Sequence, residues 1–357
     1  MTKRRSVLIT GVAGFIGFRT ALRFMSEGWM VYGIDDVNPY YDQKLKYDRL
    51  RHLEAVAAVL SAGAEESPFL FRCLRWNVRD RLNLNSMIRY SRPELVIHLA
   101  AQAGVRYSFE NPRAYVESNV DGHLAVLEAV TQNLDIVKHL VYASSSSVYG
   151  EREMTEGGFR EDSVSFDAAN SPESFYAATK LTNEMTSSVF NKHHHSLRQT
   201  GLRFFTVYGP WGRPDMAYYS MAHKIMKGEK IEVFCDHEDE ELARDFTYVD
   251  DVVEGIFRVS DRVWTPRENA QGHVIMNIGR GSPVSTLDMI SILAESLIPG
   301  RKVRDVVEFV GWKPGDVART YANVDRLREA TGYGPTIDLT EGLQRFADWF
   351  RGYHGYE

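Results

Sequence analysis

Short apolar segments rich in β-branched residues recur along the chain and alternate with longer amphipathic segments. We expect buried strands at 6–10, 30–34, 69–74, 95–99, 139–143, 202–205 and 274–278. Segments such as 120–131 and 180–192 carry leucines or charges at helical spacing. Strands that are apolar on both faces and alternate with helices indicate a parallel sheet covered on both sides. The pattern predicts an α/β fold, a doubly wound parallel sheet that binds ligands at the carboxyl ends of its strands.

A glycine-rich turn separates the first expected strand from the first expected helix. Gly11, Gly14 and Gly17 follow the apolar run 7–9, spaced three and three rather than the two and three of the common dinucleotide fingerprint. Gly11 allows a tight turn, Gly14 lets the backbone approach a pyrophosphate, and Gly17 lets the helix pack closely on the strand. The turn predicts a dinucleotide site.

An acidic residue ends the second expected strand. Asp35 lies roughly twenty residues beyond the glycine turn, where a carboxylate accepts hydrogen bonds from the adenosine ribose hydroxyls and repels a 2′-phosphate. This position favours NAD over NADP. Arg19, close to the turn, is the counter-argument, because a basic residue could meet that phosphate.

Tyr176 and Lys180 are four residues apart in an expected helix and therefore share one face. A phenol with a pKa near 10 needs a drop of about 3 units, or about 4 kcal/mol, to act as a base near neutral pH. A cation about 5 Å away supplies about 3 kcal/mol at an effective dielectric of about 20. The Lys180 ammonium together with an oxidised nicotinamide would therefore make Tyr176 a base, which predicts redox chemistry at the dinucleotide site.

Four consecutive serines, 144–147, follow the expected strand at 139–143. Their hydroxyls lie at the end of the strand where ligands bind, and one beside Tyr176 could bridge to a substrate oxygen. Serines also simply end strands, so the run alone does not assign a role.

Composition excludes several classes of function. The net charge of −6 over 357 residues gives no global basic field for nucleic acid or anionic membrane. No apolar stretch of about 18 residues is present, so we expect no membrane span. Cys73 and Cys235 are too few for a disulfide framework. The start resembles a signal peptide, but Arg19 interrupts it and no cleavage site follows, so we expect a cytoplasmic protein.

Two other features are expected to be structural only. The acidic run 236–241 is typical of a solvated loop. The triple His193–His195 ends an expected helix, with no carboxylate or cysteine at ligand spacing, so we expect no metal.

Together the motifs resemble the extended short-chain dehydrogenase/reductase family of nucleotide-sugar enzymes, nearly from end to end. The segments that carry the resemblance are TGVAGFIG at 10–17, Asp35, HLAAQAGVR at 98–106, SSSSVYG at 144–150, YAATK at 176–180 and ARDFTYVDD at 243–251. Segments 203–216 and 40–50 are similar to the UDP-glucuronate 4-epimerase branch.

The resemblance implies a Rossmann fold, a homodimer built through two helices per subunit, and bound NAD. It implies a 1–205 NAD-binding domain with a returning segment at about 246–280. A smaller interleaved domain, 206–245 and 281–357, would bind the UDP-sugar; there Pro210, Gly212 and Pro214 interrupt the alternation of strands and helices. The implied reaction is reversible 4-epimerisation of UDP-glucuronate to UDP-galacturonate through a 4-keto intermediate.

The resemblance also implies a role for each matching residue. The catalytic set is Tyr176 as base, Lys180 as its partner and Ser145, with Ser146 beside it. The cofactor-binding set is Gly11, Gly14, Phe15, Ile16, Gly17, Asp35, Asn77, Val78, Leu99, Ala100, Ala101 and Asn119, together with Tyr176 and Lys180. The substrate-binding set is Arg106, Thr206, Arg213, Arg244 and Asp316, with Thr206 and Arg213 on the sugar carboxylate.

Two departures from the family pattern bear on the reaction. Ser146 and Ser147 stand where related dehydratases and decarboxylases carry acids, so elimination and ring protonation lack their agent. Asn77 replaces an aspartate expected against adenine and can still accept one hydrogen bond and donate another. The alternatives are another nucleotide-sugar 4-epimerase, a UDP-glucuronate decarboxylase, or a non-catalytic NAD-binding sensor.

Overall fold

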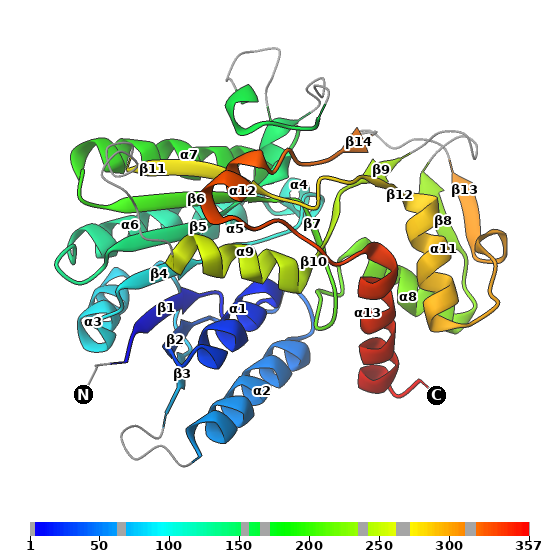
Figure 1. The fold of residues 1–357 in the computed structure, drawn as a ribbon, viewed down its shortest axis with the longest axis horizontal. Helices are drawn as coiled ribbons and strands as arrows, with labels where there is room; N and C mark the ends of the chain where they lie inside the picture. The colour runs from blue at the N-terminus through cyan, green and yellow to red at the C-terminus, as the bar shows by residue number, and fades with distance from the viewer. Residues whose placement is uncertain are drawn as a thin grey trace. The chain divides into compact units, whose positions relative to one another are not determined.

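The structure, a computed structural model, describes residues 4–62, 69–150, 157–164, 172–234, 242–261, 272–310 and 319–356 (Figure 1). The chain divides into two compact units, each built from separate stretches of sequence. The first consists of Met1–Val148, Pro172–Arg203 and Val253–Met276, and the second of Tyr149–Ser171, Phe204–Val252 and Asn277–Glu357. The domain boundaries expected from the sequence remain a prediction.

A seven-stranded sheet has the strand order β11-β6-β5-β4-β1-β2-β3. Its strands are β1 (Ser6–Thr10), β2 (Met30–Ile34), β3 (Phe71–Leu74), β4 (Leu95–His98), β5 (His139–Ser145), β6 (Arg198–Phe204) and β11 (His273–Ile278). The accompanying helices are α1 (Phe15–Ser26), α2 (Gln43–Ser61), α3 (Arg81–Ser91), α4 (Tyr107–Glu110), α5 (Pro112–Tyr115), a π-helix (Val116–Asp121), α6 (Gly122–Thr131), α7 (Phe175–His193) and α9 (Val249–Asp261).

The order of the strands reverses between β1 and β4. From β1 the chain builds outward through β2 and β3, and then returns to place β4 on the other side of β1. Both neighbours run parallel to β1, with Val7 opposite Val31 and Leu95. Ligands of open α/β sheets bind at such a reversal, beyond the carboxyl ends of the strands.

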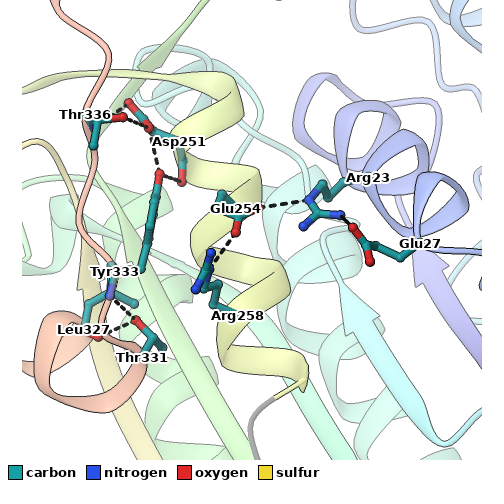
Figure 2. Close-up of polar contacts among 9 residues, drawn as sticks. All are labelled: Arg23, Glu27, Asp251, Glu254, Arg258, Leu327, Thr331, Tyr333 and Thr336. Carbon is teal, nitrogen blue, oxygen red and sulfur yellow. Dashed lines mark hydrogen bonds and ion pairs between the residues drawn. The ribbon is translucent and has the colours of Figure 1, made fainter.

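Helices cover both faces of the sheet. On one face, Leu8, Val96 and Leu140 share a buried cluster with residues of α3 and α6. On the other, α1 contacts α9, where Arg23 Nε donates to Glu254 Oε2 at 2.9 Å (Figure 2). Side chains alternate along a strand, which explains why all of Val7, Leu8 and Ile9 are fully buried. The predicted doubly wound parallel sheet is confirmed.

Two strands, β3 and β6, begin at other residues than hydropathy predicts. β3 begins at Phe71, because Phe69 is exposed to solvent. β6 begins at Arg198, four residues before the expected start, since its polar side chains find buried partners. Gln199 Nε2 donates to the Ser187 carbonyl at 3.1 Å, and Thr200 Oγ1 lies 2.9 Å from His139 Nε2. Hydropathy alone cannot predict such a strand.

The described residues of the second unit form three small sheets, β10-β7, β12-β9-β14 and β13-β8. Its strands are β7 (Thr206–Tyr208), β8 (Ile231–Phe234), β9 (Ala243–Arg244), β10 (Phe246–Tyr248), β12 (Val284–Ser285), β13 (Val307–Val310) and β14 (Arg319–Thr320). Its helices are α8 (Ala217–Lys227), α11 (Thr286–Leu297), α12 (Asp325–Thr331) and α13 (Leu339–His354), with short 3-10 turns at Glu161–Ser163 and Val303–Asp305. A further 3-10 turn, Ser146–Tyr149, follows β5 at the end of the first stretch of the first unit.

Asp251 joins the segment between α12 and α13 to the rest of this unit. Its carboxylate accepts hydrogen bonds from the Tyr333 hydroxyl at 2.7 Å and from the Thr336 amide at 3.1 Å (Figure 2). It also accepts from the Ile337 amide at 2.9 Å. Among the described helices, none is both long and apolar enough to cross a membrane.

Candidate active site

The glycine turn lies at the reversal of the strand order. Gly11 has a φ of +74°, and its amide donates to the Ile34 carbonyl at 2.7 Å. A Cβ on Gly11 would lie 2.7 Å from the amide nitrogen of Ala100, and one on Gly17 would lie 2.1 Å from the Gly11 carbonyl oxygen. A side chain at either position would collide with backbone, so the turn brings the start of α1 against β1 and β4. Gly14, the N-cap of α1, has no side chain to cover the first turn of the helix.

Asp35 lies at the end of β2 and faces the same turn. Its carboxylate accepts hydrogen bonds from the amides of Ala13 at 3.0 Å and Val37 at 2.8 Å. Burial raises the pKa of Asp35, and the Lys46 ammonium and these two amides oppose that shift. The carboxylate is therefore held in one orientation beside the loop.

The segment after β4 lies against the glycine turn. The Leu99 amide donates to the Thr10 carbonyl at 3.1 Å, and the Ala100 amide to Thr10 Oγ1 at 3.2 Å. In this segment Ala101 is half-buried, and Arg106, which precedes α4, is exposed. At the start of α1, Phe15 is buried and Ile16 is half-buried.

Asn119 lies in the π-helix, a local distortion that is frequent at functional sites. Its side-chain oxygen Oδ1 accepts from the main-chain amide of Gln102 at 2.8 Å. Its side-chain nitrogen Nδ2 donates to the main-chain carbonyl of Gln102 at 3.1 Å and to Thr179 Oγ1 at 3.0 Å. Asn119 thus links the segment after β4 to the residue that precedes Lys180.

Asn77 has both ends of its amide engaged close to β2. Nδ2 donates to Asp36 Oδ2 at 3.0 Å, and Oδ1 accepts from the Arg79 amide at 3.0 Å. The neighbouring Val78 is buried. These contacts would have to be shared or exchanged if Asn77 bound an adenine.

Tyr176 and Lys180 lie on α7, which begins where Ser174 caps it by accepting from the Ala177 amide at 3.0 Å. Lys180 is 3% exposed and donates from Nζ to the Ala143 carbonyl at 2.8 Å. Its Nζ lies 5.8 Å from the centre of the Tyr176 ring. Burial lowers the pKa of Lys180 from 10.5 to about 8, which the Glu184 carboxylate partly opposes. The tyrosine remains half-buried, accessible to a ligand.

The serine run begins at the end of β5. Ser145, the last residue of the strand, accepts at Oγ from the Ser147 amide at 3.2 Å and from the Ser147 hydroxyl at 2.9 Å. Ser146 is half-buried and begins the following 3-10 turn. Two hydrogen bonds from Ser147 leave the Ser145 proton available for another acceptor.

Except for Arg106 in the first unit, the predicted substrate residues lie in the second unit. The Thr206 amide in β7 donates to the Asp245 carbonyl at 3.1 Å. Arg213 forms a two-pronged pair with Asp215, with Nε–Oδ1 3.0 Å and Nη2–Oδ2 2.8 Å. Arg244 donates from Nη1 to the Ala243 carbonyl at 3.0 Å. Asp316 lies outside the described residues.

Sequence reasoning missed two buried acids, Asp245 next to Arg244 and Glu184 on the helix of Lys180. Asp245 accepts from the amides of Arg280, Gly281 and Ala322 at 2.7, 2.9 and 3.0 Å, so it fixes the backbone between Arg244 and β10. Glu184 forms a buried pair with Arg203 on β6. Its position four residues after Lys180, and an arginine inside an apolar strand, are the signals that point to the pair.

The residues present fit a dinucleotide. The glycine turn leaves backbone room at the N-terminus of α1, where the helix dipole favours phosphate, and Asp35 stands at the ribose position relative to it. No group of three or more metal-ligating side chains is found within the described part of the chain.

Comparisons with known proteins agree with this geometry. Residues 7–279 match the model of the NAD dependent epimerase/dehydratase family. The chain is 39% identical to UDP-glucuronate 4-epimerase 3 of Arabidopsis thaliana over 98% of its length and 77% of the relative, and 39% identical to Protein CapI of Staphylococcus aureus over 98% and 99%. The solved UDP-glucuronic acid 4-epimerase of Bacillus cereus, in complex with UDP-glucuronic acid and NAD, superposes with a TM-score of 0.81 at 28% identity, covering 98% of this chain and 99% of that one.

The matched model spans the strands, the glycine turn and the Tyr176–Lys180 helix, and the relatives extend the match to nearly the whole chain. On this evidence the chain belongs to the NAD dependent epimerase/dehydratase family, within the extended short-chain dehydrogenases/reductases.

Proposed function

We propose that the protein is a UDP-glucuronate 4-epimerase, which interconverts UDP-glucuronate and UDP-galacturonate with tightly held NAD. The observation that carries this proposal is the buried Lys180 ammonium, 2.8 Å from the Ala143 carbonyl and 5.8 Å from the Tyr176 ring. The similarity to named UDP-glucuronate 4-epimerases over nearly the whole chain supports the choice of substrate.

In the proposed reaction Tyr176 takes the proton of the sugar 4-hydroxyl, and Ser145 holds the same oxygen through its hydroxyl. The Lys180 ammonium stabilises the phenolate form of Tyr176 that accepts this proton, since a nearby positive charge favours the charged form of an acid. When bound, NAD would accept the hydride from C4 of the sugar and later return it. After the 4-keto sugar has turned over in the site, Tyr176 returns the proton, so the product differs from the substrate only at C4.

The NAD contacts are proposed on the geometry of the first unit. Gly11, Gly14, Phe15, Ile16 and Gly17 would hold the pyrophosphate. Asp35 would bind the ribose, and Asn77 and Val78 the adenine. Leu99–Ala101 and Asn119 would line the path to Tyr176 and Lys180. The Asp35 carboxylate would disfavour the 2′-phosphate of NADP by like-charge repulsion.

The substrate contacts are proposed on the chemistry of the second unit and on Arg106. Thr206 and Arg213 would hold the sugar carboxylate, because a guanidinium binds a carboxylate with two parallel hydrogen bonds. Arg106, Arg244 and Asp316 would contact the nucleotide part. Ser146 and Ser147 provide no carboxyl group to protonate the ring, which favours epimerisation over decarboxylation.

We also propose a homodimer in the cytoplasm. Phe175, Met185 and Val189 of α7 are 39%, 57% and 51% exposed, and Phe109 and Val116 on segments that contact α7 are 66% and 44% exposed. Apolar side chains gathered on adjoining helices mark an interaction surface. The low cysteine content supports a reducing compartment.

The test is incubation of purified protein with UDP-glucuronate, UDP-glucose and UDP-xylose in separate reactions, without added reductant, followed by product identification. UDP-galacturonate from UDP-glucuronate is the expected result. Turnover of UDP-glucose alone would favour a neutral-sugar 4-epimerase, and a pentose product would favour a decarboxylase. Bound NAD without any turnover would favour the sensor.

A further inference from the structure

A third charged residue, Glu184, lies on the helix that carries Tyr176 and Lys180. Positions 176, 180 and 184 are each four residues apart and so share one face of α7. Glu184 is 7% exposed. The proposed reaction assigns no step to this carboxylate. A charge so deeply buried is costly unless it is paired, so its partners are informative.

Both carboxylate oxygens of Glu184 are bound by residues of two strands. Ser144 Oγ donates to Oε1 at 2.5 Å, and Arg203 donates from Nε to Oε1 at 2.9 Å and from Nη2 to Oε2 at 2.7 Å. Ser144 belongs to β5 and Arg203 to β6, which are neighbours in the sheet. A buried two-pronged pair fixes orientation as well as distance. Glu184 therefore anchors α7 to both strands that it connects.

The anchor lies beside the catalytic residues on β5. Ala143 accepts the hydrogen bond of Lys180, Ser144 donates to Glu184, and Ser145 is the predicted catalytic serine. Two successive strand residues thus hold two successive turns of α7. A shift of the helix along β5 would break both contacts and change the position of Tyr176 relative to Ser145.

The charges around Lys180 are unevenly distributed. Its neighbours His98 on β4 and His123 on α6 are neutral near pH 7, because burial and the Lys180 ammonium lower their pKa values, that of His98 to about 3. Burial likewise lowers the pKa of His273 on β11 to about 4 and raises the pKa of Tyr142 on β5. Glu184 then supplies the negative charge that favours the ammonium.

We propose that Glu184 is a positioning residue for the epimerisation, which holds the Tyr176–Lys180 helix in register with Ser145 and keeps the Lys180 ammonium charged. This inference rests on the proposed function, because it assumes that Tyr176 acts as the base. In the absence of the ammonium, the phenol of Tyr176 would return toward its ordinary acidity and the base would be lost at neutral pH.

The test is the pH dependence of kcat, whose alkaline limb reports loss of the Lys180 proton. Glu184→Gln keeps the shape and removes the charge, so we expect the limb to move to lower pH by about one unit. At pH 7.5 this shift should lower kcat about threefold, while KM changes less than about twofold, because Glu184 does not contact the substrate. Arg203→Met breaks the same pair but keeps the Glu184 carboxylate and its hydrogen bond from Ser144, so it should not move the limb to lower pH.

A limb that moves to lower pH in Glu184→Gln but not in Arg203→Met distinguishes this role from a purely structural one, since both variants break the same pair. Glu254→Gln is the control: Glu254 on α9 pairs with Arg23 and Arg258 (Figure 2). It should lower the melting temperature without moving the limb. An unshifted limb in folded Glu184→Gln overturns the proposal.

If Glu184→Gln does not accumulate as folded protein, Glu184→Asp decides the question. Aspartate keeps the charge on a shorter side chain, so we expect the limb at the parent pH and kcat lowered several-fold by the lost contacts. A parental kcat, or a limb shifted by a full unit, would overturn the role. The profile is measured with whichever UDP-sugar the parent converts, so an inactive UDP-glucuronate refutes the proposed substrate separately from the role of Glu184.

Discussion

The ammonium of Lys180 lies 2.8 Å from the main-chain carbonyl oxygen of Ala143, two residues before Ser145 on the same strand. A lysine on α7 is thereby fixed to the strand that ends in the predicted catalytic serine. The same ammonium is 5.8 Å from the centre of the Tyr176 ring. One buried cation thus links both parts of the proposed proton-transfer site.

Removal of the Tyr176 hydroxyl tests the base directly. In Tyr176→Phe we expect kcat to fall by about 10²–10⁴-fold, the range for loss of a general base. KM and bound NAD should change little, because the ring and its edge contact with Tyr115 remain. Tyr90→Phe, which removes an exposed hydroxyl bonded to Arg72, should retain parental activity. A Tyr176→Phe enzyme with more than a tenth of the parental kcat would contradict the assignment.

Lys180 should reduce the stability of the fold while it supports catalysis. Its pKa in the folded protein, about 8, lies below its ordinary 10.5, so the unfolded chain binds more protons between these values. Stability should therefore rise from pH 8 to 10.5 as the lysine loses its proton. At pH 7, Lys180→Met should increase the free energy of unfolding by about 2 kcal/mol and abolish turnover.

Urea denaturation at pH 7 and pH 10 measures this effect. Lys44→Met, which removes an exposed lysine that pairs with Asp48, is the control and should change stability by less than about 1 kcal/mol. A Lys180→Met protein that is less stable than the parent at pH 7 would show that the hydrogen bond to Ala143 outweighs the cost of burying the charge.

Arg213 should determine the preference for a carboxylated sugar. Charge-assisted hydrogen bonds are worth about 1.5–3 kcal/mol, so Arg213→Ala should lower kcat/KM for UDP-glucuronate by about 10–150-fold. Turnover of UDP-glucose should fall much less. In the free protein Arg213 is held by Asp215, and the substrate carboxylate would have to displace or share that partner.

The same variant tests whether Arg213 restrains decarboxylation. The 4-keto intermediate is a β-keto acid, which loses carbon dioxide fastest when its carboxylate stands perpendicular to the ketone plane. Trapping of labelled carbon dioxide should show more release per turnover in Arg213→Ala than in the parent. Loss of turnover with no such increase would leave Arg213 a binding residue only.

Buried histidines should make the protein sensitive to acid. Burial lowers the pKa values of His98 and His139 from 6.5 to about 3, so each is neutral in the folded protein while the unfolded chain takes up protons below pH 6.5. Their effect on the free energy of unfolding is fully favourable above pH 6.5, and that free energy falls as the pH drops from 6.5 toward 3. At pH 5 each should cost about 2 kcal/mol of unfolding free energy.

The free energy of unfolding measured between pH 7.5 and 4.5 checks this expectation. His139→Gln can keep a hydrogen bond to Thr200 and does not titrate, so its stability should fall less steeply with acid. Identical slopes for variant and parent would assign the acid sensitivity to other groups.

The sequence by itself determined the class of fold and the chemistry of the proposed base. Strands buried on both faces produce an unmistakable alternation with amphipathic helices, and β1 and β2 have the bounds that this pattern predicts. The glycine turn and the spacing of Tyr176 and Lys180 are local features, so a few neighbouring residues suffice to recognise them.

Only the tertiary structure decided which distant groups surround those residues. Arg203 reaches Glu184 across 19 positions, Asn119 reaches Thr179 across 60, and Thr10 lies 2.7 Å from His98 across 88. Such contacts form when strands and helices that are separated in sequence become neighbours in the fold, and no local periodicity encodes them. For the same reason, the polar start of β6 became recognisable as a strand only through its buried partners.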